Sequence, residues 1–185
     1  MRVIAVVGSA SDSGKTGVAC AILRSLPGLA AVKISPREEA PRVEWGAGEP
    51  GKDTARFAAS GASLVARIVG PRDRVAEVWD GMRQRLAGAP AVLVEGAGAL
   101  ALAEERFTVL VAAAAMLGKR PERDQRLAAA ADYIVAVGAP PEGEPASGPV
   151  AEAARRGVPV LAMSVGTPDL DLRPLVEAVR AFMGA

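Results

Sequence analysis

The sequence has 185 residues and half of them are apolar, so the chain is long enough to bury a core within one domain. Its 22 Lys and Arg residues nearly balance 21 Asp and Glu residues, which leaves no broad basic field for nucleic acid or an anionic membrane. Aromatic residues make up only 3% of the chain, and this favours helices packed on a buried sheet. We therefore expect one α/β domain over residues 1–185, without nucleic-acid or membrane partners.

The single cysteine and the N-terminal residues indicate a reducing compartment. Cys20 falls in an apolar helical pattern and cannot form a disulfide within the chain, so we interpret it as a core residue. The apolar start, residues 1–7, is too short for a signal peptide and leads into a glycine turn. The longest apolar stretch, residues 86–103, is interrupted by Pro90, Glu95 and glycines, which makes it a poor membrane span. We expect a cytoplasmic protein.

Short apolar runs alternate with helical patterns along the chain. The predicted strands are residues 3–7, 29–34, 64–69, 91–94, 108–111, 133–137 and 159–163. The predicted helices are residues 16–26, 54–60, 72–86, 123–131, 150–156 and 172–183, and loops are predicted at residues 35–51 and 140–149. This order predicts a three-layer sandwich: a mostly parallel sheet of about seven strands with helices on both faces. Ligands then lie at the carboxyl ends of the strands.

The first strand leads into a run of small residues, Gly8-Ser-Ala-Ser-Asp-Ser-Gly14-Lys15-Thr16, and then into a helix. Such a loop directs backbone N–H groups at phosphate oxygens, and the start of the helix adds positive potential. The residues expected to bind nucleotide are Gly8, Ser11, Asp12, Ser13, Gly14, Lys15, Thr16 and Gly17. Lys15 would reach the terminal phosphates, and Thr16 would bind magnesium. The alternative is a small-residue turn that caps a buried helix, with Lys15 merely solvated.

The loop departs from the usual P-loop spacing. Gly8 is followed by five residues before Gly14, so the pattern is one residue longer than usual and Ser9 occupies the position of the first glycine. The sequence thus predicts a variant P-loop, and the fold class becomes that of a P-loop NTPase.

Two acids are candidates for the metal side of this site. Glu95 ends the apolar run 91–94 and precedes Gly96, so its carboxylate would meet magnesium beside the phosphates. Asp53, which opens a helix, is a second candidate, either as a magnesium ligand or as the group that orients water. Simpler roles stay open: Glu95 in an ion pair or as a helix cap, and Asp53 or Thr54 as a helix cap.

Three basic residues are candidates for contact with an anionic substrate. Lys52 and Arg56 flank Asp53, and Lys33 lies at the end of the second predicted strand, on the ligand side. A solvated lysine is the alternative at Lys33.

Four segments together resemble the molybdopterin-guanine dinucleotide biosynthesis protein B family. They are Gly8 to Thr16, Val32-Lys33-Ile34, Gly51-Lys52-Asp53-Thr54-Ala55-Arg56 with Ser60-Gly61-Ala62, and Val92-Leu-Val-Glu95-Gly96. The resemblance implies a GTP-binding protein with a slow GTPase, usually a homodimer, that assists the guanylyltransferase attaching GMP to molybdopterin. By position, Gly14, Lys15 and Thr16 would bind phosphate and magnesium, and Asp53 and Glu95 would be the metal-side acids. The family usually carries histidines where this chain has Ile34, Ser35 and Phe57.

The phosphate loop and the Glu-Gly-Ala-Gly segment are also similar to dethiobiotin synthetase and the cobyric acid synthase group. These enzymes use ATP to activate a carboxylate or carbamate, and Lys33, followed by Pro36, is loosely similar to their substrate lysine. A third class, the MinD-like switch ATPases, would have an additional loop lysine where this chain has Ala10.

These resemblances leave two hypotheses: a GTP-binding accessory protein of molybdenum cofactor biosynthesis, and an ATP-dependent biosynthetic enzyme. Lys15, Asp53 and Glu95 are the predicted catalytic residues. No Asn-Lys-x-Asp guanine motif is present, and residues 163–169, after the last predicted strand, are an alternative place for the base. Because no glutamine is evidently placed to orient water, we expect a weak nucleoside triphosphatase.

Overall fold

The computed structural model describes residues 1–10, 13–102, 104–113, 120–138, 148–163 and 171–184. Within these residues the strands are β1 (Arg2–Gly8), β2 (Ala30–Pro36), β3 (Arg42–Trp45), β4 (Leu64–Gly70), β5 (Val92–Glu95), β6 (Glu105–Ala113), β7 (Tyr133–Val137) and β8 (Val160–Met163). The α-helices are α1 (Lys15–Ser25), α2 (Asp53–Ala59), α3 (Val75–Leu86), α4 (Pro121–Ala129), α5 (Pro149–Arg155) and α6 (Arg173–Met183). Two short 3₁₀ helices are η1 (Arg72–Arg74) and η2 (Ala97–Ala101).

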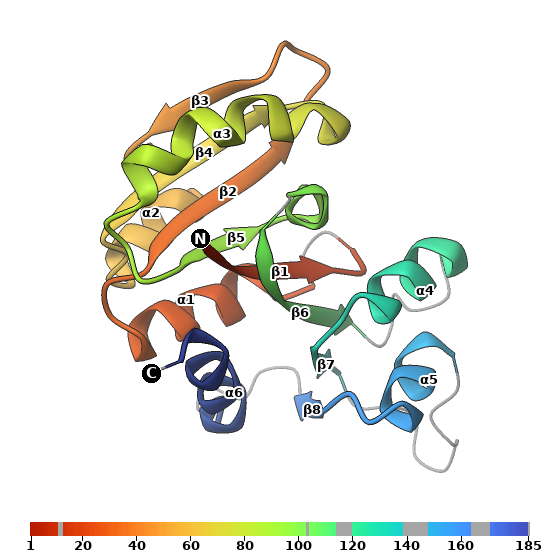
Figure 1. The fold of residues 1–185 in the computed structure, drawn as a ribbon. Helices are drawn as coiled ribbons and strands as arrows, with labels where there is room; N and C mark the ends of the chain where they lie inside the picture. The colour runs from red at the N-terminus through yellow and green to blue at the C-terminus, as the bar shows by residue number, and fades with distance from the viewer. Residues whose placement is uncertain (11–12, 103, 114–119, 139–147, 164–170, 185) are drawn as a thin grey trace.

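The strands form one sheet in the order β3-β4-β2-β5-β1-β6-β7-β8 (Figure 1). All neighbouring pairs are parallel except β3 and β4, which are antiparallel. The central strand β1 is buried from Val3 to Val7, and both of its neighbours carry continuous apolar runs. Strands covered on both faces need such runs, so the apolar patterns explain the parallel sheet.

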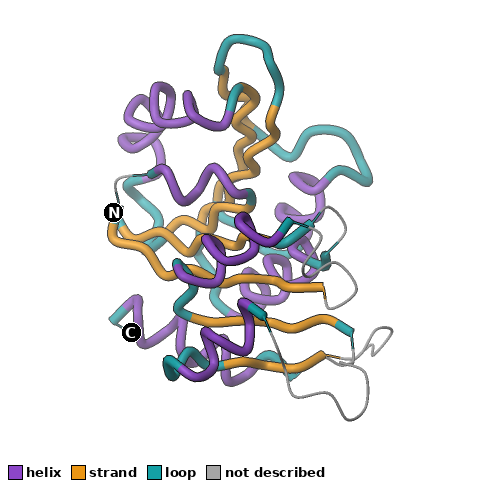
Figure 2. The backbone as a smooth tube through the Cα atoms, turned by 90° about the vertical axis from the view of Figure 1, so that its right-hand side faces the viewer, coloured by secondary structure: helices purple, strands orange, loops and turns teal. Residues whose placement is uncertain are grey.

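Helices cover both faces of the sheet (Figures 1 and 2). α1, α2 and α6 pack on one face, where Ile22, Phe57 and Leu175 are buried against the strands. α3 covers the opposite face with Trp79, and α4 and α5 extend that layer with residues such as Leu127. The predicted three-layer sandwich is therefore confirmed. In the described part of the chain, no helix combines the length and apolarity needed to cross a membrane.

Strand β3, which the sequence did not predict, corrects the prediction of a loop over residues 35–51. β3 lies within this segment and pairs with β4 at the edge of the sheet. Val43 and Trp45 pack toward the α3 layer, while Arg42 and Glu44 alternate with them on the other side. A four-residue edge strand needs only this short alternation, and the surrounding Pro, Gly and Glu residues hide it in the sequence.

Other boundaries differ by a few residues from those predicted. The helix predicted at residues 72–86 is divided into η1 and α3, and η2 follows β5 where no helix was predicted. β6 is longer than the predicted run 108–111. Most of the predicted loop 140–149 lies outside the described residues, and Pro149 already begins α5. Residues 164–169, the alternative place for the base, lie outside them as well.

The carboxyl ends of three strands meet at the centre of the sheet. Val6 of β1 and Lys33 of β2 are both in register with Glu95, the last residue of β5. α1 begins a few residues after β1, so its first turn lies at the same edge. The fold therefore brings together the segments in which the sequence predicts functional residues.

Substitution of Leu93 by alanine tests the central packing. Leu93 is fully buried in β5, so Leu93→Ala should lower the free energy of unfolding by about 2–5 kcal/mol. Urea denaturation followed by circular dichroism measures this loss. The control is Val160→Ala in β8, because Val160 is 39% exposed and its truncation should cost less than about 1 kcal/mol. Equal losses in the two variants would contradict the assignment of the core.

Candidate phosphate and metal site

The loop after β1 is built from small residues and turns directly into α1. Gly14 precedes the helix with φ at 89°, a left-handed conformation that glycine adopts without steric cost. Ser9 is buried, and its hydroxyl accepts a hydrogen bond at 3.3 Å from the backbone N–H of Ala113, which anchors the loop to β6. The predicted nucleotide-binding residues Ser11 and Asp12 lie outside the described residues.

The side chain of Lys15 lies along this loop. Its Nζ donates hydrogen bonds to the carbonyl oxygen of Ala10 at 2.5 Å and to Ser13 Oγ at 3.1 Å. Gly8 leaves room for this arrangement, because a Cβ at that position would lie 2.5 Å from Ser13 Oγ and 2.6 Å from Lys15 Cδ. The absence of a side chain at Gly8 thus allows the ammonium group to be held within the loop.

Four side chains from four separate elements converge beside the loop. Thr16 of α1 donates a hydrogen bond from Oγ1 to Glu95 Oε2 at 3.0 Å. Lys33 of β2 places Nζ 2.5 Å from Glu95 Oε1 and 2.7 Å from Asp53 Oδ2, at the start of α2. The structure therefore joins Thr16, Lys33, Asp53 and Glu95, which lie far apart in the sequence, into one cluster.

Charge pairing dominates the electrostatics of the cluster. Burial acts to lower the pKa of Lys33, but the charges of Glu95 and Asp53 and the hydrogen bonds to them outweigh it, so this pKa is raised. Burial acts to raise the pKa of Asp53, but hydrogen bonds from Lys33 and Thr16 and the charges of Lys33 and Arg56 lower it overall. Glu95 is fully buried in contact with both Lys33 and Thr16. The cluster is therefore held together by pairing of the Lys33 ammonium group with two carboxylates.

The oxygen donors of this cluster fit magnesium. Thr16, Asp53 and Glu95 offer one hydroxyl and two carboxylates, and magnesium commonly takes one or two carboxylates together with phosphate oxygens and water. No group of three or more His, Cys, Asp or Glu residues is placed to hold a metal in the described residues, so the donor set does not form an all-protein cage. Lys33 pairs with the same two carboxylates that such an ion would bind.

A polar pocket of about 400 Å³ opens from this cluster toward β3. Lys33 and Asp53 form the end nearest the phosphate loop, and Arg67 of β4 lies on its floor. The full lining is Lys33, Ser35, Glu44, Trp45, Gly46, Gly48, Glu49, Lys52, Asp53, Thr54 and Arg67. The volume is in the range of sites that bind small molecules.

The other predicted substrate residues lie around this pocket. Lys52 lines it, while Arg56 is half-exposed and lies 4.0 Å from Asp53. The sequence analysis missed Arg67, although an arginine within the apolar run Leu64–Val69 is a signal for a functional or paired charge.

Arg123 is a further residue that the sequence analysis missed. Its Nη2 donates a hydrogen bond at 2.8 Å to the carbonyl oxygen of Gly8, where the phosphate loop begins. Burial lowers the pKa of Arg123, and the charges of Arg72 and Arg120 act in the same direction. Arg123 lies in a polar stretch of α4 where an exposed arginine is ordinary, so the sequence does not indicate this contact.

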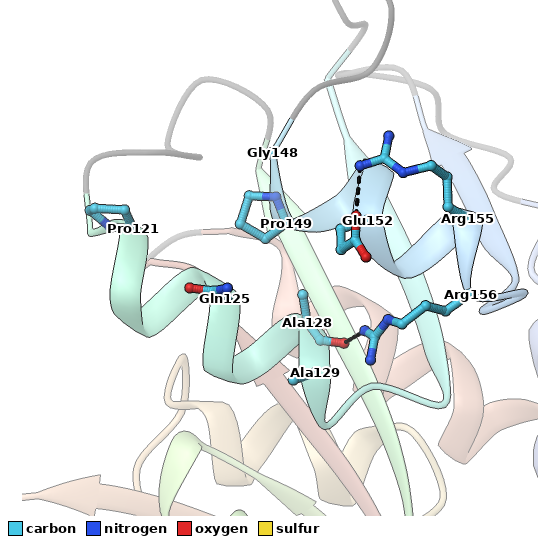
Figure 3. A pocket seen from close by; sticks show the side chains of 9 residues that line it. All are labelled: Pro121, Gln125, Ala128, Ala129, Gly148, Pro149, Glu152, Arg155 and Arg156. Atoms are coloured by element: carbon cyan, nitrogen blue, oxygen red, sulfur yellow. Dashed lines mark hydrogen bonds and ion pairs between the residues drawn. The ribbon is translucent and has the colours of Figure 1, made fainter.

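A second cavity, of about 500 Å³, lies between α4 and α5, away from the cluster (Figure 3). Alanine and proline side chains form much of its wall, and its arginines contact neighbouring groups of the chain. Arg155 pairs with Glu152 at 2.7 Å, and Arg156 donates a hydrogen bond to the carbonyl oxygen of Ala128 at 3.1 Å. This cavity contains none of the predicted functional residues.

No family model matches the sequence, and the search of curated proteins gave no match. Among solved structures, the chain is similar to HypB from Helicobacter pylori in complex with nickel. The TM-score is 0.63 at 13% identity, over 98% of this chain and 86% of HypB. The fold is of the P-loop NTPase type. A Zn(II)-bound triple mutant of the YjiA GTPase is a more remote neighbour, with a TM-score of 0.43 at 14% identity over 94% of this chain and 60% of YjiA.

Two glycines among the predicted nucleotide-binding residues, one in the loop and one in α1, should respond differently to alanine. Gly8→Ala places a methyl group against Lys15 and Ser13, so we expect at least about a tenfold loss of nucleotide affinity. Gly17 lies in α1 with open space around its Cβ position, so Gly17→Ala should retain affinity and stabilise the helix by about 0.5–1 kcal/mol. Titration with a fluorescent nucleotide, together with urea denaturation, measures both effects. Equal affinity of the two variants would contradict the loop geometry.

The lowered pKa of Asp53 predicts how stability depends on pH. A carboxylate with a folded-state pKa below its ordinary value of 3.8 stabilises the fold above that value, and the contribution is lost as pH falls through the folded-state pKa. Asp53→Asn should therefore destabilise the protein at pH 7, and the difference from wild type should shrink below about pH 4. Urea denaturation between pH 3 and 7 measures this, with the exposed Asp80→Asn as a control. A difference that stays constant with pH would refute the ion-pair assignment.

Proposed function

We propose that this protein binds a nucleoside triphosphate together with magnesium and hydrolyses it slowly. The observation that carries the proposal is the convergence of Thr16, Asp53 and Glu95 beside a loop that holds Lys15. A positively charged loop lysine, a hydroxyl and two carboxylates are the groups that bind phosphates and their magnesium ion. Their position at the carboxyl ends of β1, β2 and β5 is where open α/β sheets bind ligands.

Each residue has a separate part in this proposal. Lys15 and the N–H groups at the start of α1 bind the phosphates and stabilise negative charge during phosphate transfer. Thr16, Glu95 and Asp53 would hold magnesium, which would supply positive charge to offset that of the phosphates. Asp53 also lies near the pocket, where it can orient a water or an acceptor group. Catalysis then rests on positioning and charge.

Slow hydrolysis follows from the positions of the glutamines. Gln84 is exposed on α3, and Gln125 lines the cavity between α4 and α5, so neither lies in the cluster (Figure 3). P-loop GTPases that hydrolyse rapidly use a glutamine to orient water and an arginine to stabilise the transition state. Intrinsic turnover below about one per minute is therefore expected.

The biological role that we propose is in molybdenum cofactor biosynthesis, as a GTP-binding homodimer that assists the guanylyltransferase acting on molybdopterin. The segment Gly51-Lys52-Asp53-Thr54-Ala55-Arg56 supports this role, because it is the most specific part of the resemblance and includes Asp53 of the cluster. Binding of nickel, the metal in the HypB complex, has less support. The sequence has no histidine, and its one cysteine, Cys20, is buried in α1, so the ligands that nickel prefers are lacking.

The second candidate is an ATP-dependent enzyme that activates a carboxylate or carbamate. The pocket beside Lys33 favours it, because an acceptor bound there would lie next to the phosphate site. In such a reaction an acceptor oxygen attacks the terminal phosphorus, the bond from that phosphorus to the bridging oxygen breaks, and the nucleoside diphosphate leaves.

A titration with GTP and ATP, each with magnesium, tests the proposal. Lys15→Ala should weaken binding at least about a hundredfold, because it removes a cation from the phosphates. Glu95→Gln should reduce the dependence of binding on magnesium. Arg24→Ala, in the last turn of the same helix, is the control and should bind as wild type does.

The nucleotide preference then separates the two candidates. Preference for GTP that is lost in Lys15→Ala supports the cofactor role, and binding to the guanylyltransferase is the next measurement. Preference for ATP supports the ATP-dependent enzyme that activates a carboxylate or carbamate. Binding of neither nucleotide by wild type, or turnover well above about one per minute without a partner, contradicts the proposed function.

A further inference from the structure

Four charged side chains form a row across the sheet beside the phosphate site. Glu44 of β3 is in register with Arg67 of β4, Arg67 with Lys33 of β2, and Lys33 with Glu95 of β5. Residues in register on neighbouring strands point to the same face. Lys33 lies two residues after Ala31, which packs in the α1–α2 layer, so the row faces that layer. Three members of the row, Glu44, Arg67 and Lys33, line the polar pocket.

Within the row, two cations are neighbours. Parallel strands are about 4.8 Å apart, so Lys33 and Arg67 stand side by side on β2 and β4. Each is compensated from its other side: Lys33 by Glu95 and Asp53, and Arg67 by Glu44 at 3.4 Å. Arg67 Nε also donates a hydrogen bond to Ser35 Oγ at 2.9 Å, which fixes the guanidinium over the floor. In the described part of the chain, its Nη2 makes no hydrogen bond.

Magnesium would change this balance. An ion held by Asp53 and Glu95 takes up the negative charge that now compensates Lys33, because a bound divalent cation is the largest local charge in such a site. Lys33 would then lack its counter-charge and would stand beside Arg67, which stays paired with Glu44, in a half-buried pocket. Such a pair attracts an anion that accepts hydrogen bonds from both groups.

The shape of the pocket limits the size of that anion. The floor is made by β2 and β4, the roof by the segment 46–52 and the start of α2, and the outer end by Glu44 of β3. Its volume of about 400 Å³ suits a metabolite rather than a macromolecule. Glu49 and Lys52 at the rim offer one acceptor and one donor group to the rest of such a ligand.

We propose that this pocket binds a small molecule through a carboxylate or other oxyanion held between Lys33 and Arg67, and that bound magnesium nucleotide increases its affinity. The coupling to nucleotide rests on the proposed function. The anion site itself rests only on the row of charged side chains. The bound oxyanion lies next to the terminal phosphate, where it is placed either as an acceptor or as a ligand that regulates hydrolysis.

Isothermal titration calorimetry measures occupancy of the pocket. Wild type, with a non-hydrolysable nucleotide analogue and magnesium, is titrated with succinate, with sulfate, and with the neutral analogue succinamide. The analogue fills the phosphate loop, so an anion that still binds does so elsewhere. Saturable binding of succinate without binding of sulfate shows that the pocket selects a carboxylate. Binding of both anions shows that it accepts oxyanions in general. Succinamide should not bind.

Arginine variants assign the binding to the pocket. Arg67→Gln should weaken anion binding at least about tenfold, because it removes charge-assisted hydrogen bonds, and Arg67→Lys should restore part of it. Arg42→Gln is the matched control: Arg42 contacts the same Glu44 at 3.0 Å but does not line the pocket, so affinity should change less than about twofold. Lys33→Gln should remove the increase in affinity caused by magnesium nucleotide.

Binding of a fluorescent nucleotide, measured on the same samples, separates the two proposals. Wild type that binds nucleotide but neither anion overturns the pocket while the nucleotide function stands. Equal anion binding by Arg67→Gln and wild type also overturns it, as does displacement of the anion by the nucleotide analogue. If nucleotide binding fails, anion binding that depends on Arg67 still supports the pocket, and only its coupling to nucleotide is lost.

Discussion

The ion pair between Lys33 and Glu95 is the interaction on which the site depends. Glu95 is fully buried at the end of a central strand, and an uncompensated charge at such a position is strongly unfavourable. The ammonium group of Lys33 lies 2.5 Å from the Glu95 carboxylate, and the Thr16 hydroxyl donates a hydrogen bond to the other oxygen of that carboxylate. Because Lys33 also pairs with Asp53, one ammonium group ties β2, β5 and the start of α2 together, and Thr16 adds α1. The site is therefore part of the fold, and not a set of side chains placed on its surface.

This pairing also relates two states of the site. Without a divalent ion, Lys33 is the cation that satisfies Asp53 and Glu95. An ion bound by the same carboxylates with Thr16 replaces that compensation, and the lysine must then find negative charge elsewhere. Nucleotide phosphates on one side and the polar pocket on the other are the two places where it can do so. Under the proposed function, the cluster would couple the phosphate loop to the pocket through charge, without requiring a change of backbone structure.

Much of this arrangement could be predicted from the sequence, for identifiable reasons. Continuous apolar runs identified the buried strands, and the small-residue run before Lys15 identified the loop, because both are local signals. The place of Glu95 beside Thr16 followed from the rule that ligand-binding residues lie at the carboxyl ends of strands, whereas Asp53, which opens a helix, was grouped with them through the family resemblance. Lys33 was identified only as a possible substrate contact, since no local pattern shows that it pairs with two acids distant in the sequence.

The part that escaped prediction is the edge of the sheet, and its chemistry explains why. An edge strand is half exposed, so β3 carries charged residues where a central strand would carry valine, and its sequence resembles a loop. Yet Glu44 acquires its role from the register with Arg67, and Arg67 acquires its role from the register with Lys33. These relations exist only after three strands have paired. A pocket whose floor is assembled by register therefore has to be found in the structure, while a phosphate loop, which is continuous in the chain, is visible in the sequence.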